Sequence, residues 1–482
     1  MILTFLISLL AAVGPLLRGS WDLWAQSILL LAVVSGFGLW LLTRIAVGFV
    51  PLPSNRLMVW TGLLAILSAA SAWASPVPGP ARAQWFVFLG GLWIFPAMAA
   101  VGKDERTRID QAVRAGAWVL MLLAFHEHFI LHVERPTSTL LNQNVYAGAV
   151  LMLLPLALER GDWLLGIGLF WSLWWTRSAG AWLGLAGALA ITQRRSNPML
   201  SRVGMAVAVV CGVILYARLQ TPEVLHRWGW WRAAWAMAAH RPLLGYGPGT
   251  FAYVLSAYRA LSPFGLYSLY AHQYFLETAA GFGLPFALLW FAGLWRGLAR
   301  AGAYKRFAVF AVLIQSLWDY PLSVPGLFWL FCYCAASAIP DSPRGVNVPS
   351  PRRPIAAVLV VGLGWFFCGN IWSLWSASRA AVAAAEAEAA GEFGKARELL
   401  AKAGKLNPLD AERALLEADV ELRDAAGRPG DLLAAAAALE EAAFLNPYRP
   451  ATWTQLARVY RMMGRDALAA LVERRSERFL PR

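Results

Sequence analysis

Charged side chains are scarce in this sequence. Only 15% of its 482 residues are Asp, Glu, Lys or Arg, whereas 59% are hydrophobic and the mean hydropathy is +0.52. A soluble domain would carry about a quarter charged residues, so an ordinary soluble fold is excluded. Apolar runs near the length that crosses a bilayer recur from the first residue to about Trp375. The composition therefore indicates a polytopic membrane protein.

Cysteine is also rare. The four cysteines all fall inside predicted membrane spans, so we expect apolar fillers and no disulfide framework: Cys211, Cys332, Cys334 and Cys368. The segment HEHFILH (His126–His132) departs from the zinc-protease motif, because Ile130 stands where that motif needs its second histidine. We therefore expect neither a metal site nor a cofactor.

The apolar runs predict an all-α membrane bundle of 12 or 13 transmembrane helices. The expected spans are 2–17, 24–42, 57–74, 84–101, 112–132, 143–158, 162–176, 180–193, 203–219, 272–295, 306–318, 321–339 and 355–375. The first run lacks a basic segment before it, and the next run follows almost at once. It is therefore predicted to be a span, with a cleaved signal peptide as the alternative.

The net charge of +14 is unevenly distributed. The tail, residues 376–482, holds 16 basic and 16 acidic residues, so the excess lies in the membrane part, with 26 basic against 12 acidic. Basic loops favour contact with anionic lipids, and no basic stripe with interleaved aromatics suggests nucleic acid. Lys and Arg concentrate in the loops on the side of the N-terminus, such as Lys103–Arg108 and Arg296–Arg306. This bias predicts a cytoplasmic N-terminus, with the long loop 220–271 and the tail on the opposite side.

The tail is predicted to form helical repeats. The segments ELLAKAGKLNPLDAERALLEADVEL and ALEEAAFLNPYRPATWTQLARVYRMMG each contain a helix, a Leu-Asn-Pro turn and a second helix. Asn407 and Asn446 lie 39 residues apart, and the insert Gly427–Asp431 can reconcile this spacing with the 34-residue tetratricopeptide period. The tail therefore resembles a tetratricopeptide domain that could hold a protein partner. A simple Ala-rich helical hairpin is the alternative.

Ionisable residues gather on the side of the membrane that holds the long loop. These are Arg177, Arg227, Arg232, His240, Arg241, His272 and Asp319. Guanidinium groups bind phosphate oxygens through paired hydrogen bonds and stay charged beside headgroups, so the cluster suits a lipid ligand that carries a diphosphate. Taken singly, each residue has a structural explanation, because arginines at span ends reach to headgroups and an Asp before a proline stabilises a turn.

Five segments in order resemble one known family. They are STLLNQNVYAGAVLMLLPLAL, TRSAGAWLGL, HRWGWWRAAWAMAAHRPLLGYGPGTF, AHQYFLETAAGFGLPFALLWF and QSLWDYPLSVPG. Between about Thr139 and Pro340 the chain is similar to the O-antigen ligase and O-antigen polymerase superfamily. The resemblance implies a glycosyltransferase at the periplasmic face of a bacterial inner membrane. Its donor would be a glycan linked to undecaprenyl diphosphate, and its acceptor a hydroxyl of lipid A-core or of a growing polysaccharide.

The resemblance also implies roles for single residues. His272 takes the place of the family histidine proposed as base, and Arg227 and Trp231 match the R-x-x-x-W element that binds the donor diphosphate, with no metal required. Arg232 would assist Arg227, while Asp319 and Arg241 would support the site. The family commonly reads Ser-Arg-Gly-Ala-Trp, whereas this chain has Ala179 at the arginine position. Arg177, two residues earlier, is the nearest candidate to replace that arginine.

Three other functions stay open at this stage. The segment QSLWDYPLSVPG is also similar to protein O-oligosaccharyltransferases, in which the acceptor is a protein side chain. A transporter or flippase of lipid-linked sugars should show repeats in the span pattern and broken helices, and neither is evident in the sequence. A non-catalytic assembly factor would use the tail and would tolerate loss of His272 and Arg227.

Overall fold

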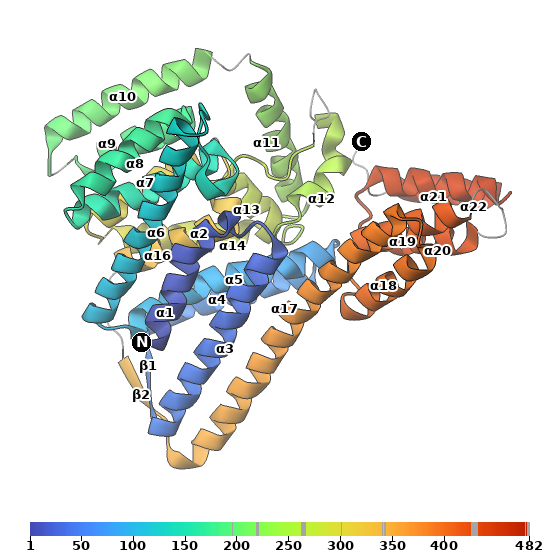
Figure 1. Ribbon diagram of the computed structural model, residues 1–482, viewed down its shortest axis with the longest axis horizontal. Helices are drawn as coiled ribbons and strands as arrows, with labels where there is room; N and C mark the ends of the chain where they lie inside the picture. Colours follow the sequence, from blue (N-terminus) through green and yellow to red (C-terminus); the bar gives the residue numbers. More distant parts are fainter. Residues whose placement is uncertain are drawn as a thin grey trace.

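The computed structural model describes the chain apart from residues 195, 218–220, 262–266, 300, 340, 342–343, 426–431, 478 and 480–482. The insert Gly427–Asp431 and part of the loop 220–271 thus lie outside the described residues. The described chain is almost entirely helical, as predicted, and forms a bundle from which a second group of helices projects (Figure 1).

The bundle contains helices from the whole length of the chain up to α17. Its helices are α1 (Ile2–Ser8), α2 (Gly14–Leu16), α3 (Leu23–Val47), α4 (Asn55–Trp73), α5 (Pro78–Ala100), α6 (Lys103–Phe129), α7 (Gln143–Glu159), α8 (Trp163–Thr176), α9 (Ala179–Thr192), α10 (Pro198–Ala217), α11 (Pro222–His240), α12 (Phe251–Leu255), α13 (Tyr274–Phe282), α14 (Leu284–Leu298), α15 (Ala303–Gln315), α16 (Pro325–Ala338) and α17 (Arg353–Ala389). A π-helical stretch, Leu9–Val13, joins α1 to α2.

Four helical segments of the described chain are long and apolar enough to cross a membrane: Leu23–Val47, Asn55–Trp73, Pro78–Ala100 and Ser350–Ala389. Six shorter apolar helices accompany them, which agrees with an all-α polytopic membrane protein. Helix lengths alone do not test the predicted number of spans, so that number stays a prediction.

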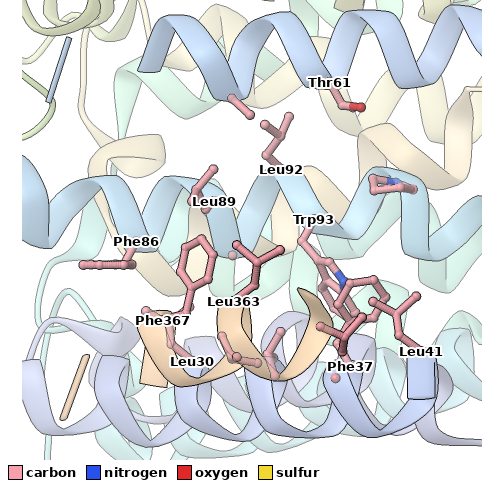
Figure 2. Close-up of a pocket in the computed structure, with 18 of the residues that line it drawn as sticks. Leu30, Phe37, Leu41, Thr61, Phe86, Leu89, Leu92, Trp93, Leu363 and Phe367 are labelled. Carbon is pink, nitrogen blue, oxygen red and sulfur yellow. The ribbon is translucent and has the colours of Figure 1, made fainter. Parts of the chain in front are cut away.

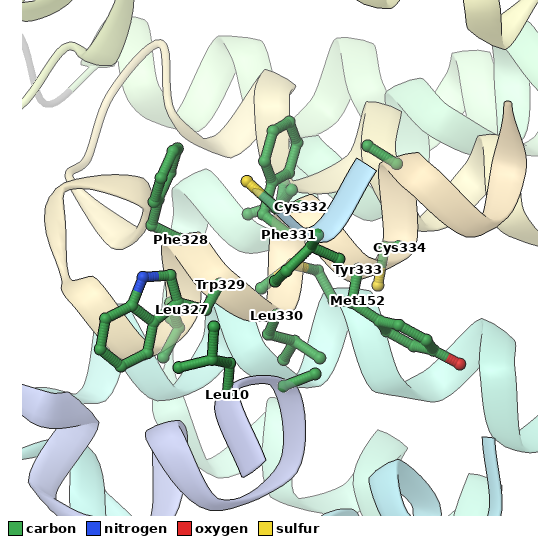
Figure 3. Close-up of a cluster of buried hydrophobic side chains, with 14 of the residues drawn as sticks. Leu10, Met152, Leu327, Phe328, Trp329, Leu330, Phe331, Cys332, Tyr333 and Cys334 are labelled. Atoms are coloured by element: carbon green, nitrogen blue, oxygen red, sulfur yellow. The ribbon is translucent and has the colours of Figure 1, made fainter. Parts of the chain in front are cut away.

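Helix α16 occupies the centre of the bundle. Trp329, Leu330, Phe331 and Tyr333 are each 0% exposed, and Figure 3 shows their side chains leaving α16 in several directions to meet other helices. The Trp329 indole N–H donates to the Val87 carbonyl of α5 at 3.0 Å. A helix that is apolar on all sides belongs in a core, and α16 therefore gives the loop before it a rigid support.

The predicted span 272–295 is not one helix. It begins in a loop and then breaks into α13 and α14 at Gly283, where φ is +88° and ψ is 164°. Only glycine adopts this conformation readily, and Pro285 starts the next helix because its ring suits the first turn. One continuous span was predicted here, and the structure has two helices.

A short pair of strands accompanies the helices. Strand β1 (Phe49–Leu52) follows α3 and pairs antiparallel with β2 (Arg344–Asn347), so that Leu52 faces Arg344. The Arg353 guanidinium donates to the carbonyls of Ala46 and Val348 and so joins α3 to the end of β2. These bonds close the end of the bundle at which α3 and α17 meet (Figure 1).

The tail begins as an extension of the bundle. Helix α17 passes without interruption through the predicted boundary at residue 376 and ends at Ala389. Five helices follow: α18 (Phe393–Leu406), α19 (Ala411–Asp424), α20 (Leu432–Leu445), α21 (Pro450–Met462) and α22 (Asp466–Ser476). Each Leu-Asn-Pro turn joins two helices, α18 to α19 and α20 to α21. In both turns the Asn side chain accepts a hydrogen bond from the N–H two residues on.

Both Leu-Asn-Pro turns lie against the bundle. A Cβ at Gly79, in the first turn of α5, would lie 2.4 Å from the Leu409 carbonyl oxygen, so the two backbones approach closely. The Tyr448 ring packs edge-on against Tyr246 at 5.2 Å, and Asn446 Nδ2 lies 3.5 Å from the Tyr253 carbonyl. The tail is thus docked on the long loop rather than tethered loosely to it.

Candidate functional site

The candidate site is built around Asp319, in the connection between α15 and α16. The residue is 3% exposed, and its Oδ1 accepts the N–H of Tyr320 at 3.1 Å. The turn before it is held by α15, because the N–H groups of Trp318 and Asp319 both donate to the Gln315 carbonyl. A buried carboxylate needs positive or hydrogen-bonding partners, and two predicted site residues lie next to it.

The first partner is His272, whose Nδ1 lies 3.4 Å from Asp319 Oδ1. This distance exceeds that of a good hydrogen bond, so the contact is a loose electrostatic one that substrate binding can tighten. The imidazole stacks on Trp230 at 4.8 Å and meets the edge of Tyr320 at 4.6 Å. With its side chain 17% exposed, His272 is confined but accessible.

The backbone of His272 is held in an uncommon conformation. Its φ is +54°, in the left-handed region that residues other than glycine rarely adopt. Three contacts hold this loop: Glu277 Oε2 accepts the N–H of Ala271 at 2.8 Å, the Tyr274 N–H donates to the Ser316 carbonyl, and the Trp231 indole N–H donates to the His272 carbonyl. Strained backbone of this kind is frequent at functional sites.

The second partner is Arg227, near the beginning of α11. Its Nη1 donates to the Trp318 carbonyl, and its Nη2 lies 3.8 Å from Asp319 Oδ2. Trp231 lies one helical turn further along and packs against Trp318 at 5.3 Å. The R-x-x-x-W spacing of α11 therefore places a guanidinium and an indole on one helix face, both directed at the Trp318–Asp319 turn.

Aromatic residues that the sequence did not single out complete the site. Tyr320 stacks on Tyr270 at 4.9 Å, and Trp21 packs edge-on against both rings. Burial, aided by the Asp319 charge, raises the pKa of Tyr320 to about 12, and burial also raises the pKa of Tyr270. Both phenols therefore stay protonated at neutral pH.

The other predicted arginines lie apart from Asp319. Arg177, in the left-handed conformation after α8, pairs with Glu134 at 3.3 Å on the surface. Arg232 is exposed on α11. Arg241 ends α11 and donates to the Ala74 carbonyl, with its guanidinium 5.4 Å from the Tyr246 ring. The 14 residues from Arg227 to Arg241 correspond to about 21 Å of helix. Arg241 therefore lies at the opposite end of α11 from Arg227.

The position of the family's missing arginine is nevertheless near the site. A Cβ at Gly180, which directly follows Ala179, would lie 3.7 Å from Trp318 Cβ. The first turn of α9 thus packs against the turn that Arg227 contacts. Arg177 precedes this turn and is directed instead to Glu134, because its left-handed backbone ends α8 before α9 begins.

Side chains of the histidine-rich segment, His126–His132, contact residues close by. The His128 ring stacks on Trp175 at 4.2 Å, with Nδ1 3.1 Å from the Val133 carbonyl. Glu127 accepts the N–H groups of Thr137 and Ser138. In the part of the chain that the structure describes, no group of three or more His, Cys, Asp or Glu residues is arranged to hold a metal ion.

One family model matches part of the chain. Residues 146–291, from α7 into α14, match the family model of O-antigen ligases. This segment of the chain is similar to O-antigen ligases. It includes Arg177, Arg227, Trp231 and His272, whereas Asp319 lies beyond its end. No curated protein matches the chain. The match supports the resemblance to O-antigen ligases over this part of the chain.

Proposed function

We propose that this protein transfers a glycan from undecaprenyl diphosphate to an acceptor hydroxyl at the periplasmic face of a bacterial inner membrane. The acceptor in this proposal is lipid A-core or a growing polysaccharide, and no metal ion takes part. The observation that carries the proposal is the convergence of His272 and Arg227 on the buried carboxylate of Asp319, 3.4 and 3.8 Å away.

In this proposal Asp319 orients the imidazole. With Nδ1 turned toward the carboxylate, the proton resides on Nδ1 and the lone pair of Nε2 is available for a substrate proton. The acceptor oxygen attacks the anomeric carbon while Nε2 takes the hydroxyl proton. The new glycosidic C–O bond forms as the anomeric C–O bond to the diphosphate breaks, and the lipid diphosphate departs with the bonding electrons.

Arg227 would stabilise the leaving group. Charge grows on the diphosphate as the anomeric bond breaks, and a fixed guanidinium nearby lowers the energy of that state. Arg227 is anchored by the Trp318 carbonyl and is 22% exposed at its side chain, so one face of the guanidinium remains available to phosphate oxygens. Arg177 and Arg232 would contribute less, since neither contacts the Asp319 cluster among the described residues.

The aromatic residues suit the boundary between lipid and water. Tyr and Trp prefer this depth of a membrane, and Trp21, Trp230, Tyr270 and Tyr320 surround the His272–Asp319 pair. The proposed donor could keep its polyprenyl chain in the bilayer while the sugar reaches His272. In the same proposal the docked tail, of tetratricopeptide type, is the surface for a protein partner.

The test uses purified protein in detergent with a synthetic glycan on a polyprenyl diphosphate. We expect His272→Ala to lower the transfer rate by about 10²- to 10⁴-fold and to leave donor binding within about twofold. Arg227→Ala should weaken donor binding, and Arg227→Lys should restore it only in part, because an ammonium lacks the planar two-point fork. Full activity of His272→Ala, or loss of wild-type activity in chelator, would contradict the mechanism.

The acceptor can be identified in cells that lack the protein. Loss of all long glycans on lipid A-core indicates a ligase, whereas a single repeat unit left on lipid A-core indicates a polymerase. An unchanged lipopolysaccharide with loss of glycan from proteins would assign the protein O-oligosaccharyltransferase function instead. Unchanged glycolipids and glycoproteins would contradict the proposed transfer.

A further inference from the structure

An apolar hollow in the bundle shares no residue with the Asp319 cluster. It is a groove of about 490 Å³ between α3 and α4, with α5 as its floor and α17 on one side. Figure 2 shows Leu30, Phe37 and Leu41 of α3 opposite Thr61 of α4, with Phe86 and Trp93 of α5 between them. The volume is within the ~300–1,000 Å³ of ordinary ligand sites.

The lining of the groove suits a hydrocarbon chain. Thr61 is the one hydroxyl-bearing residue of the lining, and its hydroxyl already donates to the Leu57 carbonyl of its own helix. Met58 and Leu363, which also line the groove, are 37% and 58% exposed. Because these helices are apolar and long enough to cross a membrane, the groove opens sideways to lipid rather than to water.

One end of the groove carries positive charge. Its lining ends at Leu52, Pro53 and Met58, next to the β1–β2 pair. Arg344 faces Leu52 in that pair, and its Nη2 lies 3.9 Å from Met58 Sδ. Arg353 lies two helical turns before Val360, a lining residue of α17, and its guanidinium is held by backbone carbonyls alone.

Nearby acidic groups do not neutralise these arginines. The carboxylate of Asp341 accepts the N–H of Ser54 at 3.1 Å. Across the described ranges, neither Arg344 nor Arg353 forms an ion pair with a carboxylate. An apolar groove that ends at unneutralised guanidinium groups has the polarity of an anionic phospholipid, with hydrocarbon along its length and phosphate at one end.

A buried polar atom near the charged end of the groove also favours a phospholipid as the ligand. The Trp93 indole Nε1 is buried and has no hydrogen-bond partner in the described part of the chain. Trp93 lines the groove close to Phe37 and Leu41 (Figure 2). An ester carbonyl of a glycerophospholipid would give this donor the acceptor that the protein does not supply.

We propose that this groove binds one anionic glycerophospholipid, with an acyl chain between α3 and α4 and the phosphate at Arg344. The bound lipid stabilises the contact among α3, α4 and α17 at the end of the bundle that carries β1 and β2. This site is independent of the Asp319 cluster and does not depend on the proposed transfer.

The test is lipid titration of the purified full-length protein, read as the first bound lipid by native mass spectrometry. Phosphatidylglycerol should bind more tightly than phosphatidylcholine with the same acyl chains, by about fivefold for each contributing arginine. Arg344→Gln should lower phosphatidylglycerol affinity about fivefold and leave phosphatidylcholine unchanged. Arg202→Gln, on α10, is the matched control and should change neither.

The glycines of the groove allow a steric test. A Cβ at Gly62 or at Gly364 would meet nothing within 4 Å, although both residues line the groove. Gly62→Leu should therefore fill the groove without clashing at its root and lower the affinity for both lipids at least tenfold. Gly364→Leu should likewise fill the groove, from the side of α17, and lower the affinity for both lipids. Gly212→Leu, at an equally open position on α10, is the control.

Several results would overturn the proposal. Equal affinity for the two lipids would contradict the proposed contact between the phosphate and Arg344. Unchanged binding in both Gly62→Leu and Gly364→Leu would contradict binding of the acyl chain in the groove. Displacement of phosphatidylglycerol by undecaprenyl phosphate at a lower concentration than by phosphatidylglycerol itself would assign the groove to a polyprenyl carrier. Loss of binding in Gly212→Leu to the same degree would show that the effect is not local.

Discussion

At the scale of single residues, Asp319 connects the two groups proposed to act on substrate. Its carboxylate is 3% exposed and lies near both the His272 imidazole and the Arg227 guanidinium. The Arg227 guanidinium, 3.8 Å away, gives this buried carboxylate a fixed counter-charge. The negative charge can then hold His272 in one tautomer and support the positive charge that forms on it during transfer.

Asp319→Asn tests this role, because the amide keeps the shape of the side chain and loses its charge. We expect the transfer rate to fall about 10²- to 10⁴-fold while the KM for the donor changes less, since the orientation of His272 affects the reaction more than binding. Steady-state kinetics at several donor concentrations measure the two effects separately. Asp22→Asn, which removes a surface pair with Arg18, is the control. Equal losses in both variants would deny Asp319 a specific role.

Glu277 acts on the same loop through a backbone bond. Its Oε2 accepts the N–H of Ala271, a residue that is 0% exposed. Glu277→Ala would leave this donor unsatisfied at a cost of about 1–3 kcal/mol and would loosen the backbone at His272. We expect a lower thermal midpoint and about tenfold slower transfer. Glu277→Gln retains an acceptor oxygen, so it should recover most of both losses; a Gln variant as slow as Ala would show that the charge matters.

At the scale of elements, the break between α13 and α14 sets the position of the site. Gly283 adopts φ +88°, and its N–H donates to the Ala279 carbonyl, while the Leu284 N–H donates to the Pro242 carbonyl beyond α11. The N–H groups of Tyr246 and Gly247 also donate to the Ala280 and Gly281 carbonyls at the end of α13. The GYGPGT segment therefore acts as a backbone clamp on α13, which fixes the loop that carries His272.

Gly283→Ala should break this clamp. A Cβ there would lie 2.3 Å from the Leu243 carbonyl oxygen, and the conformation is strained for any residue with a side chain. We expect a loss of at least about 1–3 kcal/mol in the free energy of unfolding, measured by thermal unfolding in detergent. Gly212→Ala on α10, where a Cβ meets nothing within 4 Å, should be neutral or slightly stabilising. Equal stability of the two variants would mean that the backbone at Gly283 can accept a side chain without loss of stability.

At the scale of the whole molecule, the tail is docked on the bundle but contributes little to its core. The main apolar cluster includes no residue after Leu374. The tail has apolar clusters of its own, built from α17–α19 and from α19–α22. Ion pairs such as Arg397 with Glu421 and Arg423 with Glu388 lie within the tail. The contact between the two parts is made chiefly by the Leu-Asn-Pro turns.

Removal of residues 391–482 should therefore leave a bundle that folds. We expect the shortened protein to accumulate in membranes and to unfold cooperatively, with a modestly lower thermal midpoint because Tyr246 and Tyr253 lose Tyr448 and Asn446. Tyr448→Ala in the full chain should reproduce part of that decrease, and Phe444→Ala, at a position 78% exposed, is its control. Failure to accumulate in membranes would show that the tail is part of the bundle's own core.

Composition and apolar periodicity were sufficient to predict the membrane bundle, and turn residues were sufficient to predict the helix pairs of the tail. These features depend on local propensity and on the length of each run. The bias of Lys and Arg among the loops places His272, Arg227 and Asp319 on one side of the membrane, and this placement stays a prediction. Sequence could not show that Gly283 breaks a helix, because a single glycine is tolerated within many helices.

The sequence by itself determined which residues of this protein carry charge in an apolar chain, and hence which could act. Only the tertiary structure decided which of them meet. Arg177 and Arg227 are both candidates for donor binding in the sequence, although Arg177 is shifted by two residues from the family position. In the structure Arg227 lies beside Asp319 and Arg177 pairs with Glu134. The difference arises because Arg177 ends α8 in a left-handed conformation on the surface, whereas Arg227 lies in the first turns of α11 beside the Trp318–Asp319 turn. Such positions depend on packing between segments far apart in the chain, which local patterns do not encode.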